Sequence, residues 1–254
     1  MPEVGVSAAV AAIELVQLAH KQGWFDRLIT ALRKKHRVLV LGPTGTGKTL
    51  FLKSLTEAVP EAIDLMSRTE FVDAKHIRIS KQPFVFIDTP GQTLHRSRRI
   101  QAIREEMKND IAGVINVVSY GYHESRAVNR KGAIANGRVD KSFLERQRQQ
   151  EMRQLHEWTP LLGAKETTGW LITVVAKADL WWGQRNQVRK HYESGAYYEA
   201  LGPAKELNPV VLEYCSVFQK FYGEVRMSGE FQDRDRDRAR ADILREILAA
   251  IGRK

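Results

Sequence analysis

The chain has 254 residues, 43% of them hydrophobic, and its 40 Lys and Arg against 30 Asp and Glu give a formal net charge of +10. This length and composition exclude overall disorder and allow one large α/β domain with additions. No apolar run reaches the roughly 18 residues of a membrane span, and the first residues lack the basic start of a secretory signal, which predicts a cytoplasmic protein. The positive charge favours anionic partners such as nucleic acid or anionic lipid, although it is spread along the chain.

Residues 1–36 predict an N-terminal helical extension. Residues 7–21 are rich in alanine, and a second helix after Gly23 places five apolar residues on one face: Trp24, Phe25, Leu28, Ile29 and Leu32. Basic residues follow directly. This helix can pack on its own domain, lie at the inner surface of an anionic membrane, or contact a second copy of the chain, and the sequence leaves the three uses open.

A glycine-rich loop follows the first predicted strand. Residues 37–41 form a short, mostly apolar run that predicts a buried strand. Residues 42–49 then read Gly-Pro-Thr-Gly-Thr-Gly-Lys-Thr, which fits the phosphate-loop pattern G-x-x-x-x-G-K-[ST], and apolar residues at helical spacing follow up to Pro60. Strand, loop and helix therefore come in the order that a phosphate-binding unit requires.

This loop supplies the first candidate binding residues. Glycines let successive backbone N–H groups point at one spot, and the helix that follows adds the positive end of its dipole, so a polyphosphate fits there. Lys48 is expected to reach the outer phosphates, and the Thr49 hydroxyl is expected to bind Mg²⁺. The predicted nucleotide-binding residues of the loop are Gly42, Thr44, Gly45, Thr46, Gly47, Lys48 and Thr49.

An acidic turn follows the next pair of predicted strands, residues 71–80 and 83–87. The turn reads Asp88-Thr89-Pro90-Gly91-Gln92. A carboxylate at the end of a buried strand beside the phosphate loop is well placed to hold Mg²⁺ through water, so Asp88 is a predicted metal-site residue. Gly91 can offer its N–H to a γ-phosphate.

The middle of the chain combines an apolar strand with a basic segment. Residues 111–120 are apolar and β-branched, which predicts another buried strand. Residues 121–137 are rich in Gly, Asn, Arg and Lys, and a polar helix is predicted from about Lys141 to Trp158. We interpret residues 121–160 as a basic insertion that leads into the crossover helix and is either a partner surface or a solvated loop.

Two further strands end in short polar motifs. Residues 170–176 run into Lys177-Ala178-Asp179, and residues 210–214 run into Cys215-Ser216-Val217, with a helix predicted over 188–201. A closing helix at about 234–252 carries apolar residues spaced to pack on a sheet: Ile243, Leu244, Ile247, Leu248 and Ile251. The alternation of strands and helices predicts an α/β fold with a mostly parallel central sheet.

The phosphate loop, the turn at Asp88 and the motif Lys177-x-Asp179 stand at the ends of successive strands in the order of Ras-like and translation-factor-class GTPases. The chain resembles this family over residues 37 to about 220. In this resemblance the third motif is the one that indicates a preference for guanine. The resemblance implies a three-layer P-loop NTPase fold, a G domain over residues 37–254, and GTP or GDP with Mg²⁺ as ligands. With its extra N-terminal helices, the chain resembles a bacterial member of this family.

The third motif also has a chemical reason to select guanine. A carboxylate offers two acceptors, and guanine presents its N1–H and its N2 amino group side by side, whereas adenine has no such pair of donors. We therefore expect Asp179 to read that edge. The resemblance implies that Lys177 lays its methylene stem over the base, and that Ser216, with Cys215 or Val217, touches the base.

The resemblance also implies residues for hydrolysis. Gln92 is expected to orient the attacking water and, together with Lys48 and Gly91, forms the predicted catalytic set. A threonine in the segment before Phe71 is expected to complete the Mg²⁺ shell, and we select Thr69 over Ser67. Arg68 beside it is either an arginine finger in cis or an exposed side chain.

Two positions depart from the family pattern. Ala176 stands where the family has Asn or Thr, a residue that helps tie the base loop to the phosphate loop, so base affinity is expected to be weaker. Thr44 stands where Ras-like members have Gly, and its side chain is expected to crowd an arginine finger supplied by a partner.

The sequence thus predicts a Mg²⁺-dependent GTPase that acts as a molecular switch, in which the γ-phosphate holds residues 61–70 and 89–99 until hydrolysis releases them. Protein effectors or regulators are expected partners. Three alternatives stay open: a nucleotide-binding scaffold with little hydrolysis, motivated by Ala176 and Thr44; a P-loop ATPase in which Asp179 does not choose the base; and an RNA-associated GTPase, motivated by charge.

Overall fold

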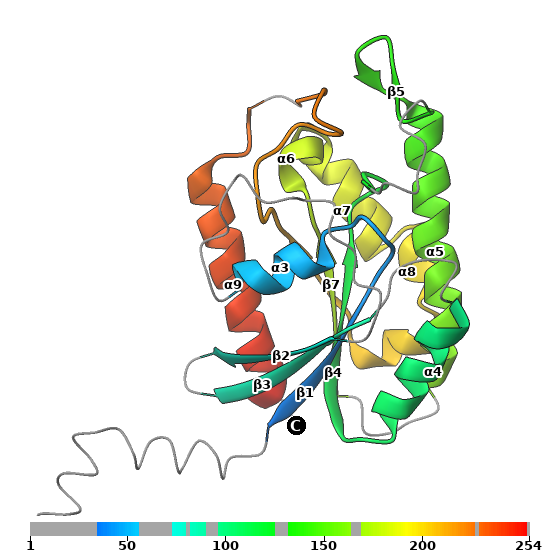
Figure 1. Ribbon diagram of the computed structural model, residues 1–254, viewed down its shortest axis with the longest axis vertical. Coiled ribbons are helices and arrows are strands. Elements are labelled where there is room, and N and C mark those ends of the chain that lie inside the picture. The colour runs from blue at the N-terminus through cyan, green and yellow to red at the C-terminus, as the bar shows by residue number, and fades with distance from the viewer. Residues whose placement is uncertain are drawn as a thin grey trace, which may run out of the picture.

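The computed structural model describes residues 35–55, 73–79, 82–89, 96–124, 132–163, 169–226 and 229–252. Within these ranges, a six-stranded sheet has the order β2-β3-β1-β4-β7-β8 (Figure 1). Only β2 is antiparallel to its neighbour. The strands are β1 (His36–Leu41), β2 (Asp73–Ile79), β3 (Gln82–Asp88), β4 (Ile111–Val118), β7 (Leu171–Val175) and β8 (Val210–Glu213). The predicted α/β fold with a mostly parallel sheet is therefore confirmed.

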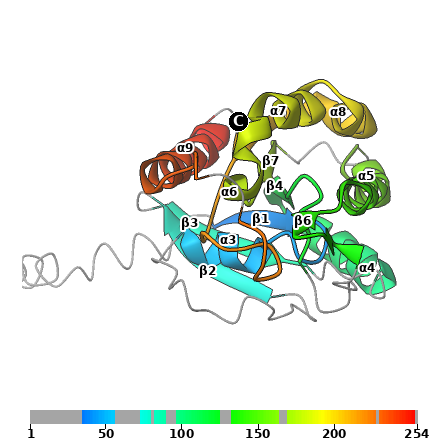
Figure 2. The ribbon, with the colours of Figure 1, turned by 90° about the horizontal axis from the view of Figure 1, so that it is seen from above.

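Helices cover both faces of the sheet and make three layers. One face carries α3 (Lys48–Ser54) and α9 (Asp233–Gly252). The other carries the four helices α4 (Arg96–Met107), α5 (Lys141–Gly163), α7 (Arg185–Glu193) and α8 (Ala196–Ala200). In both views α4 and α5 lie side by side, and α9 lies on the opposite side of the molecule (Figures 1 and 2).

Short elements connect these layers. A two-stranded hairpin of β5 (Ile134–Ala135) and β6 (Arg138–Val139) precedes α5. The single-turn helix α6 (Ala178–Trp181) follows β7 and continues into the 3-10 helix η3 (Trp182–Gln184). A second 3-10 helix, η4 (Gly202–Leu207), leads into β8.

The core arises from the two-residue repeat of the strands. In β1, Leu39 and Leu41 pack toward the α5 side, whereas Val38 and Val40 pack toward the α3 and α9 side, and all four are fully buried. Both faces of such a strand are covered, which is why it reads as a continuous apolar run in the sequence. This double coverage leaves the two ends of the sheet as the places where polar side chains can gather.

Helix α5 is the crossover between β4 and β7. It ends at Gly163, five residues beyond the predicted end at Trp158, and it keeps Pro160 inside its last turns. Leu155, Trp158 and Leu162 are buried in the core on the α5 side, and this packing explains the continuation past proline. Residues 141–160, which the sequence analysis assigned to a basic insertion, are thus part of this helix.

The prediction of one continuous helix over 188–201 is wrong, because two helices, α7 and α8, occupy that range. Ser194 and Gly195 separate α7 from α8, and Gly195 has an extended backbone (φ −99°, ψ −157°). A Cβ at Gly195 would lie 2.9 Å from the carbonyl oxygen of Lys190. The break lets Tyr192 and Tyr197 turn back into the same core, with ring centroids 4.7 Å apart.

One arginine of α4 is buried. Arg99 is 1% exposed and pairs with Glu157 of α5, whose carboxylate also accepts from Arg96 at 3.1 Å. A guanidinium at this depth needs such a partner, because burying an unpaired charge is costly. The other arginines of this helix, Arg96, Arg98 and Arg104, are exposed.

Several predictions concern residues outside the described ranges. They include the N-terminal helices over 1–34, the candidates Ser67, Arg68 and Thr69, and the pair Gly91 and Gln92. The division of the chain at residue 36 also stays a prediction. In the described part of the chain, no helix is both long and apolar enough to cross a membrane.

Candidate functional site

Five polar segments meet at one edge of the sheet. The phosphate loop (residues 42–47) follows β1, Asp88 ends β3, residues 119–124 follow β4, the turn 177–179 follows β7, and residues 214–219 follow β8. Because β1, β3, β4, β7 and β8 run in the same direction, their carboxyl ends lie together, which is where open α/β sheets bind ligands.

The phosphate loop depends on two tightly packed glycines. Gly42 has φ +133°, and a Cβ there would lie 2.0 Å from the carbonyl oxygen of Val117. Gly45 has φ +82°, and a Cβ there would lie 2.3 Å from the carbonyl oxygen of Glu124. Any side chain at either position would collide with backbone, so the loop can curl in this way only with glycine.

Threonines complete the shape of the phosphate loop. The Thr46 hydroxyl donates to the carbonyl oxygen of Pro43 at 3.0 Å and is fully buried. The Thr44 hydroxyl is also buried, and it has no hydrogen-bond partner among the described residues. A buried hydroxyl in this state has capacity for a ligand atom.

Lys48 lies against the loop that precedes it. Its Nζ donates to the carbonyl oxygens of Gly42 at 2.9 Å and Pro43 at 3.0 Å, and the side chain is buried. Burial lowers the pKa of Lys48 to about 8, and the nearby Asp88 carboxylate offsets part of that effect. The ammonium is thus partly desolvated and directed toward the loop, as a phosphate-binding cation should be.

Thr49 and Asp88 form the predicted metal pair. The Thr49 hydroxyl at the start of α3 donates to Asp88 Oδ2 at the end of β3, at 3.0 Å. A hydroxyl and a carboxylate are the oxygen donors that Mg²⁺ takes beside phosphates. The residues present therefore fit a magnesium ion. Thr89, next to Asp88, is held to β1, because its hydroxyl donates to the carbonyl oxygen of Val40 at 3.0 Å.

The Lys177-Ala178-Asp179 turn, the candidate base loop, follows β7 and begins α6. Lys177 has a left-handed backbone (φ 58°), which is unusual for a residue with a side chain. Its Nζ donates to the carbonyl oxygen of Tyr122 at 2.8 Å and to Glu124 Oε2 at 2.7 Å. A hydrogen bond also spans the turn, because Trp181 Nε1 donates to the carbonyl oxygen of Ala176 at 2.8 Å.

Asp179 faces the loop after β8. The Cys215 thiol donates to its Oδ1 at 3.2 Å, and the backbone N–H of Gln219 donates to its Oδ2 at 3.3 Å. Burial raises the pKa of the Asp179 carboxyl, and these hydrogen bonds oppose that shift. Each carboxylate oxygen has a second lone pair, so both can still accept from a ligand.

The three residues of the final predicted motif differ in accessibility. Ser216 is partly exposed, whereas Cys215 and Val217 are buried. Burial raises the pKa of the Cys215 thiol well above its usual value, and the neighbouring Asp179 adds to the shift. The thiol is therefore a hydrogen-bond donor to Asp179 rather than a reactive nucleophile.

Sequence reasoning missed the residues of the turn after β4. Glu124 accepts from Lys177, Gln219 and Tyr222, and the buried carboxylate of Glu151 accepts from four groups behind the same turn. No motif marks these positions. The one local signal was Gly121, which breaks the apolar strand pattern and indicates a turn.

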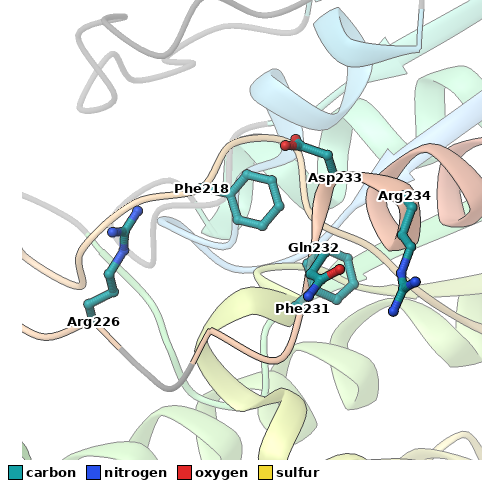
Figure 3. A pocket seen from close by; sticks show the side chains of 6 residues that line it. All are labelled: Phe218, Arg226, Phe231, Gln232, Asp233 and Arg234. Carbon is teal, nitrogen blue, oxygen red and sulfur yellow. The ribbon is translucent and has the colours of Figure 1, made fainter.

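Two cavities lie beside this edge. One has a volume of about 520 Å³, and the first residue of its lining, Phe218, follows Val217 in the chain. Figure 3 shows the residues that line it: Phe218, Arg226, Phe231, Gln232, Asp233 and Arg234. The other, of about 570 Å³, carries four cationic side chains and two tyrosines: Arg138, Lys141, Arg148, Arg226, Tyr120 and Tyr122. None of the described residues that line this second cavity carries a carboxylate.

Comparisons with known proteins agree with this geometry. Residues 37–157 match the model of a family described as "50S ribosome-binding GTPase". A solved structure titled "The Structure of the Mammalian SRP Receptor" matches with a TM-score of 0.51 and 13% sequence identity, covering 85% of this chain and 100% of that chain. At this identity the likeness shows the fold alone. No curated protein matches the sequence.

Proposed function

Because the chain carries a P-loop GTPase domain, the G domain, we propose that it binds GTP and GDP with Mg²⁺, hydrolyses GTP to GDP and phosphate, and acts as a molecular switch. One observation carries the proposal: the sheet brings the phosphate loop and the base loop to the same edge. A nucleotide has phosphates at one end and a base at the other, and this edge offers matching groups for both.

The phosphate end is bound by the loop after β1. Backbone N–H groups of residues 44–47 and the start of α3 supply donors, and Lys48 exchanges its bonds to the carbonyl oxygens of Gly42 and Pro43 for the outer phosphates. When bound, Mg²⁺ neutralises phosphate charge. Thr49 and Asp88 are the described residues that would hold it.

The base end is bound by the loop after β7. Asp179 accepts from the N1–H and the N2 amino group of guanine, while the Cys215 thiol and the Gln219 N–H hold the carboxylate in place. The Lys177 stem covers the base, and Ser216 and Val217 close the loop beside it. Hydrolysis then needs a positioned water, which we assign to Gln92, while Gly91 offers its N–H to the γ-phosphate and Thr69 completes the metal shell.

The proposal is tested by competition for a fluorescent guanine nucleotide with and without Mg²⁺. We expect GTP and GDP to displace the probe while ATP and ADP do not, and we expect chelation of Mg²⁺ to weaken GTP binding. Equal displacement by ATP would favour the P-loop ATPase alternative and remove Asp179 from the site.

Base choice is expected to change when Asp179 is replaced by asparagine. The amide offers one acceptor and one donor in place of two acceptors, so affinity for guanine nucleotides should fall by roughly 100-fold and affinity for xanthine nucleotides should rise. Competition binding with GDP and xanthosine diphosphate measures both. Asp242→Asn, on the partly exposed surface of α9, is the matched control and should leave selectivity unchanged. Unaltered selectivity in Asp179→Asn contradicts the assignment.

Turnover is expected to depend on Gln92. Replacing it by leucine removes the amide that orients water, so single-turnover hydrolysis should slow by on the order of 100-fold while GTP affinity stays within a few-fold. Gln101→Leu, on the exposed face of α4, is the control. If the wild-type protein shows no more hydrolysis than Gln92→Leu, the scaffold alternative replaces the switch.

Partners are proposed at the level of chemistry. A switch needs protein effectors or regulators that distinguish its GTP and GDP states. The cavity with four cationic side chains is the described surface to which an anionic partner such as RNA would be attracted. A homodimer, a cytoplasmic location and contact with the inner membrane surface stay predictions from the sequence.

A further inference from the structure

Glu124 contacts three of the polar segments that meet at the candidate site. Its backbone N–H donates to the carbonyl oxygen of Gly45 in the phosphate loop at 3.1 Å. Its Oε2 accepts from Lys177 Nζ of the base loop at 2.7 Å and from Gln219 Nε2 at 3.0 Å. Its Oε1 accepts from the backbone N–H of Tyr222 at 2.6 Å. One residue thus joins the phosphate loop, the base loop and the segment after β8.

These contacts are strong because of where they lie. The side chains of Glu124 and Lys177 are only 13% and 11% exposed. A hydrogen bond between opposite charges that are shielded from water is stronger than a neutral one or an exposed ion pair. Both carboxylate oxygens have donors, so the side chain has one orientation.

The contact with the phosphate loop is equally close. The Glu124 carbonyl oxygen would lie 2.3 Å from a Cβ at Gly45, so the two backbones approach each other as only glycine permits. The residue before Lys177 cannot make a second connection through its side chain, because Ala176 has only a methyl group. Among these residues, the polar link between the two loops runs through Glu124.

A buried carboxylate on α5 holds the turn that presents Glu124. Glu151 Oε1 accepts from the backbone N–H groups of Ser119 and Gly121, each at 3.1 Å, and from His123 Nε2 at 2.8 Å. Its Oε2 accepts from the Tyr192 hydroxyl at 2.6 Å. Glu151 is 1% exposed. The position of Glu124 is therefore set by the core and does not await a ligand.

We propose that Glu124 is a positioning residue that couples the phosphate loop to the base loop, and that this coupling sets both the residence time of the nucleotide and the preference for guanine. The inference rests on the proposed function. A nucleotide bridges the two loops, so a fixed separation between them lowers the entropy lost on binding. Without the Glu124 carboxylate, the bond to the Tyr122 carbonyl oxygen is the one that Lys177 Nζ keeps among the described residues.

The test is the full chain with Glu124→Gln, loaded with a fluorescent guanine diphosphate and mixed with excess GDP. The amide keeps the shape but loses the negative charge that holds Lys177, so we expect the dissociation rate constant to rise by roughly tenfold or more. The ratio of GDP to ADP affinity should fall in the same variant. Glu193→Gln removes an exposed ion pair with Arg189 and should change neither quantity.

A second variant separates positioning from general destabilisation. Gln219→Ala removes one donor to Glu124 but keeps the backbone N–H that contacts Asp179, and it should shift the dissociation rate and the selectivity in the same direction by a smaller factor. This variant also tests the inference if Glu124→Gln does not fold. Wild-type dissociation rates and selectivity in both folded variants overturn the inference while the proposed function stands. No guanine nucleotide binding by the wild-type protein overturns both.

Discussion

Replacing Lys48 by methionine is expected to reduce the affinity for Mg²⁺-bound GDP and GTP by about 100-fold or more. Loss of charge-assisted hydrogen bonds to phosphate corresponds to about 3 kcal/mol, and 1.4 kcal/mol is tenfold in a binding constant. Methionine is unbranched and apolar, so it fills the buried space next to Gly42 and Pro43 without adding a polar group. Isothermal titration with GDP measures the loss.

The same variant should fold normally. Burial lowers the pKa of Lys48 to about 8, which means that the ammonium is less stable in the folded protein than in the unfolded chain, so removing it is not expected to lower the free energy of unfolding. Lys53→Met, at an exposed position of the same helix, is the control for affinity. Binding within a few-fold of wild type in Lys48→Met would falsify the assignment of residues 42–49 as the phosphate site.

Replacing Glu151 by leucine is expected to lower the free energy of unfolding by about 3–5 kcal/mol, as for other buried charged groups whose partners are left unpaired. Four donors lose their acceptor: the N–H groups of Ser119 and Gly121, His123 Nε2 and the Tyr192 hydroxyl. Urea unfolding measures the change. Glu145→Leu, on the exposed face of the same helix, removes only a surface pair with Arg148 and should cost no more than about 1 kcal/mol.

The effect of Glu151 should depend on pH. Burial raises the pKa of Glu151, but hydrogen bonds from His123, Tyr192 and the Ser119 N–H outweigh it and leave the pKa below its usual value. A carboxyl whose pKa is lowered on folding stabilises the protein above its unfolded pKa, about 4.3, and loses that contribution as the pH falls through the folded value. The difference in the free energy of unfolding between wild type and Glu151→Leu should therefore become smaller below about pH 4. A difference that does not change with pH would contradict an ionised Glu151.

The strands and the motifs at their ends could be read from the sequence. Strands buried on both faces give short continuous apolar runs, and their ends are marked by residues with a conformational or chemical requirement, such as Gly42, Asp88 and Asp179. Because strand direction and order follow from βαβ connections, the meeting of these residues at one edge was also predictable. The structure places Thr49 beside Asp88 and Asp179 beside Cys215, as that reasoning requires.

Other features depend on contacts between residues far apart in the chain. Glu124 and Gln219 are 95 positions apart, and Glu151 and Tyr192 are 41 apart. Neither pair belongs to a local pattern, because side chains that accept hydrogen bonds across a fold need only a position and a direction, not a sequence neighbour. The break at Gly195 and the burial of Arg99 have the same origin in packing.

Local sequence therefore determined which residues are candidates to bind phosphate, metal and base, since each task demands a particular residue type at a particular strand end. Tertiary structure decided how the phosphate loop and the base loop are held together. Any hydrogen-bond acceptor at a suitable position can hold the two loops together, so this role requires no particular residue type and no recognisable sequence motif. Only folding shows that Glu124, backed by Glu151 on α5, has the required position.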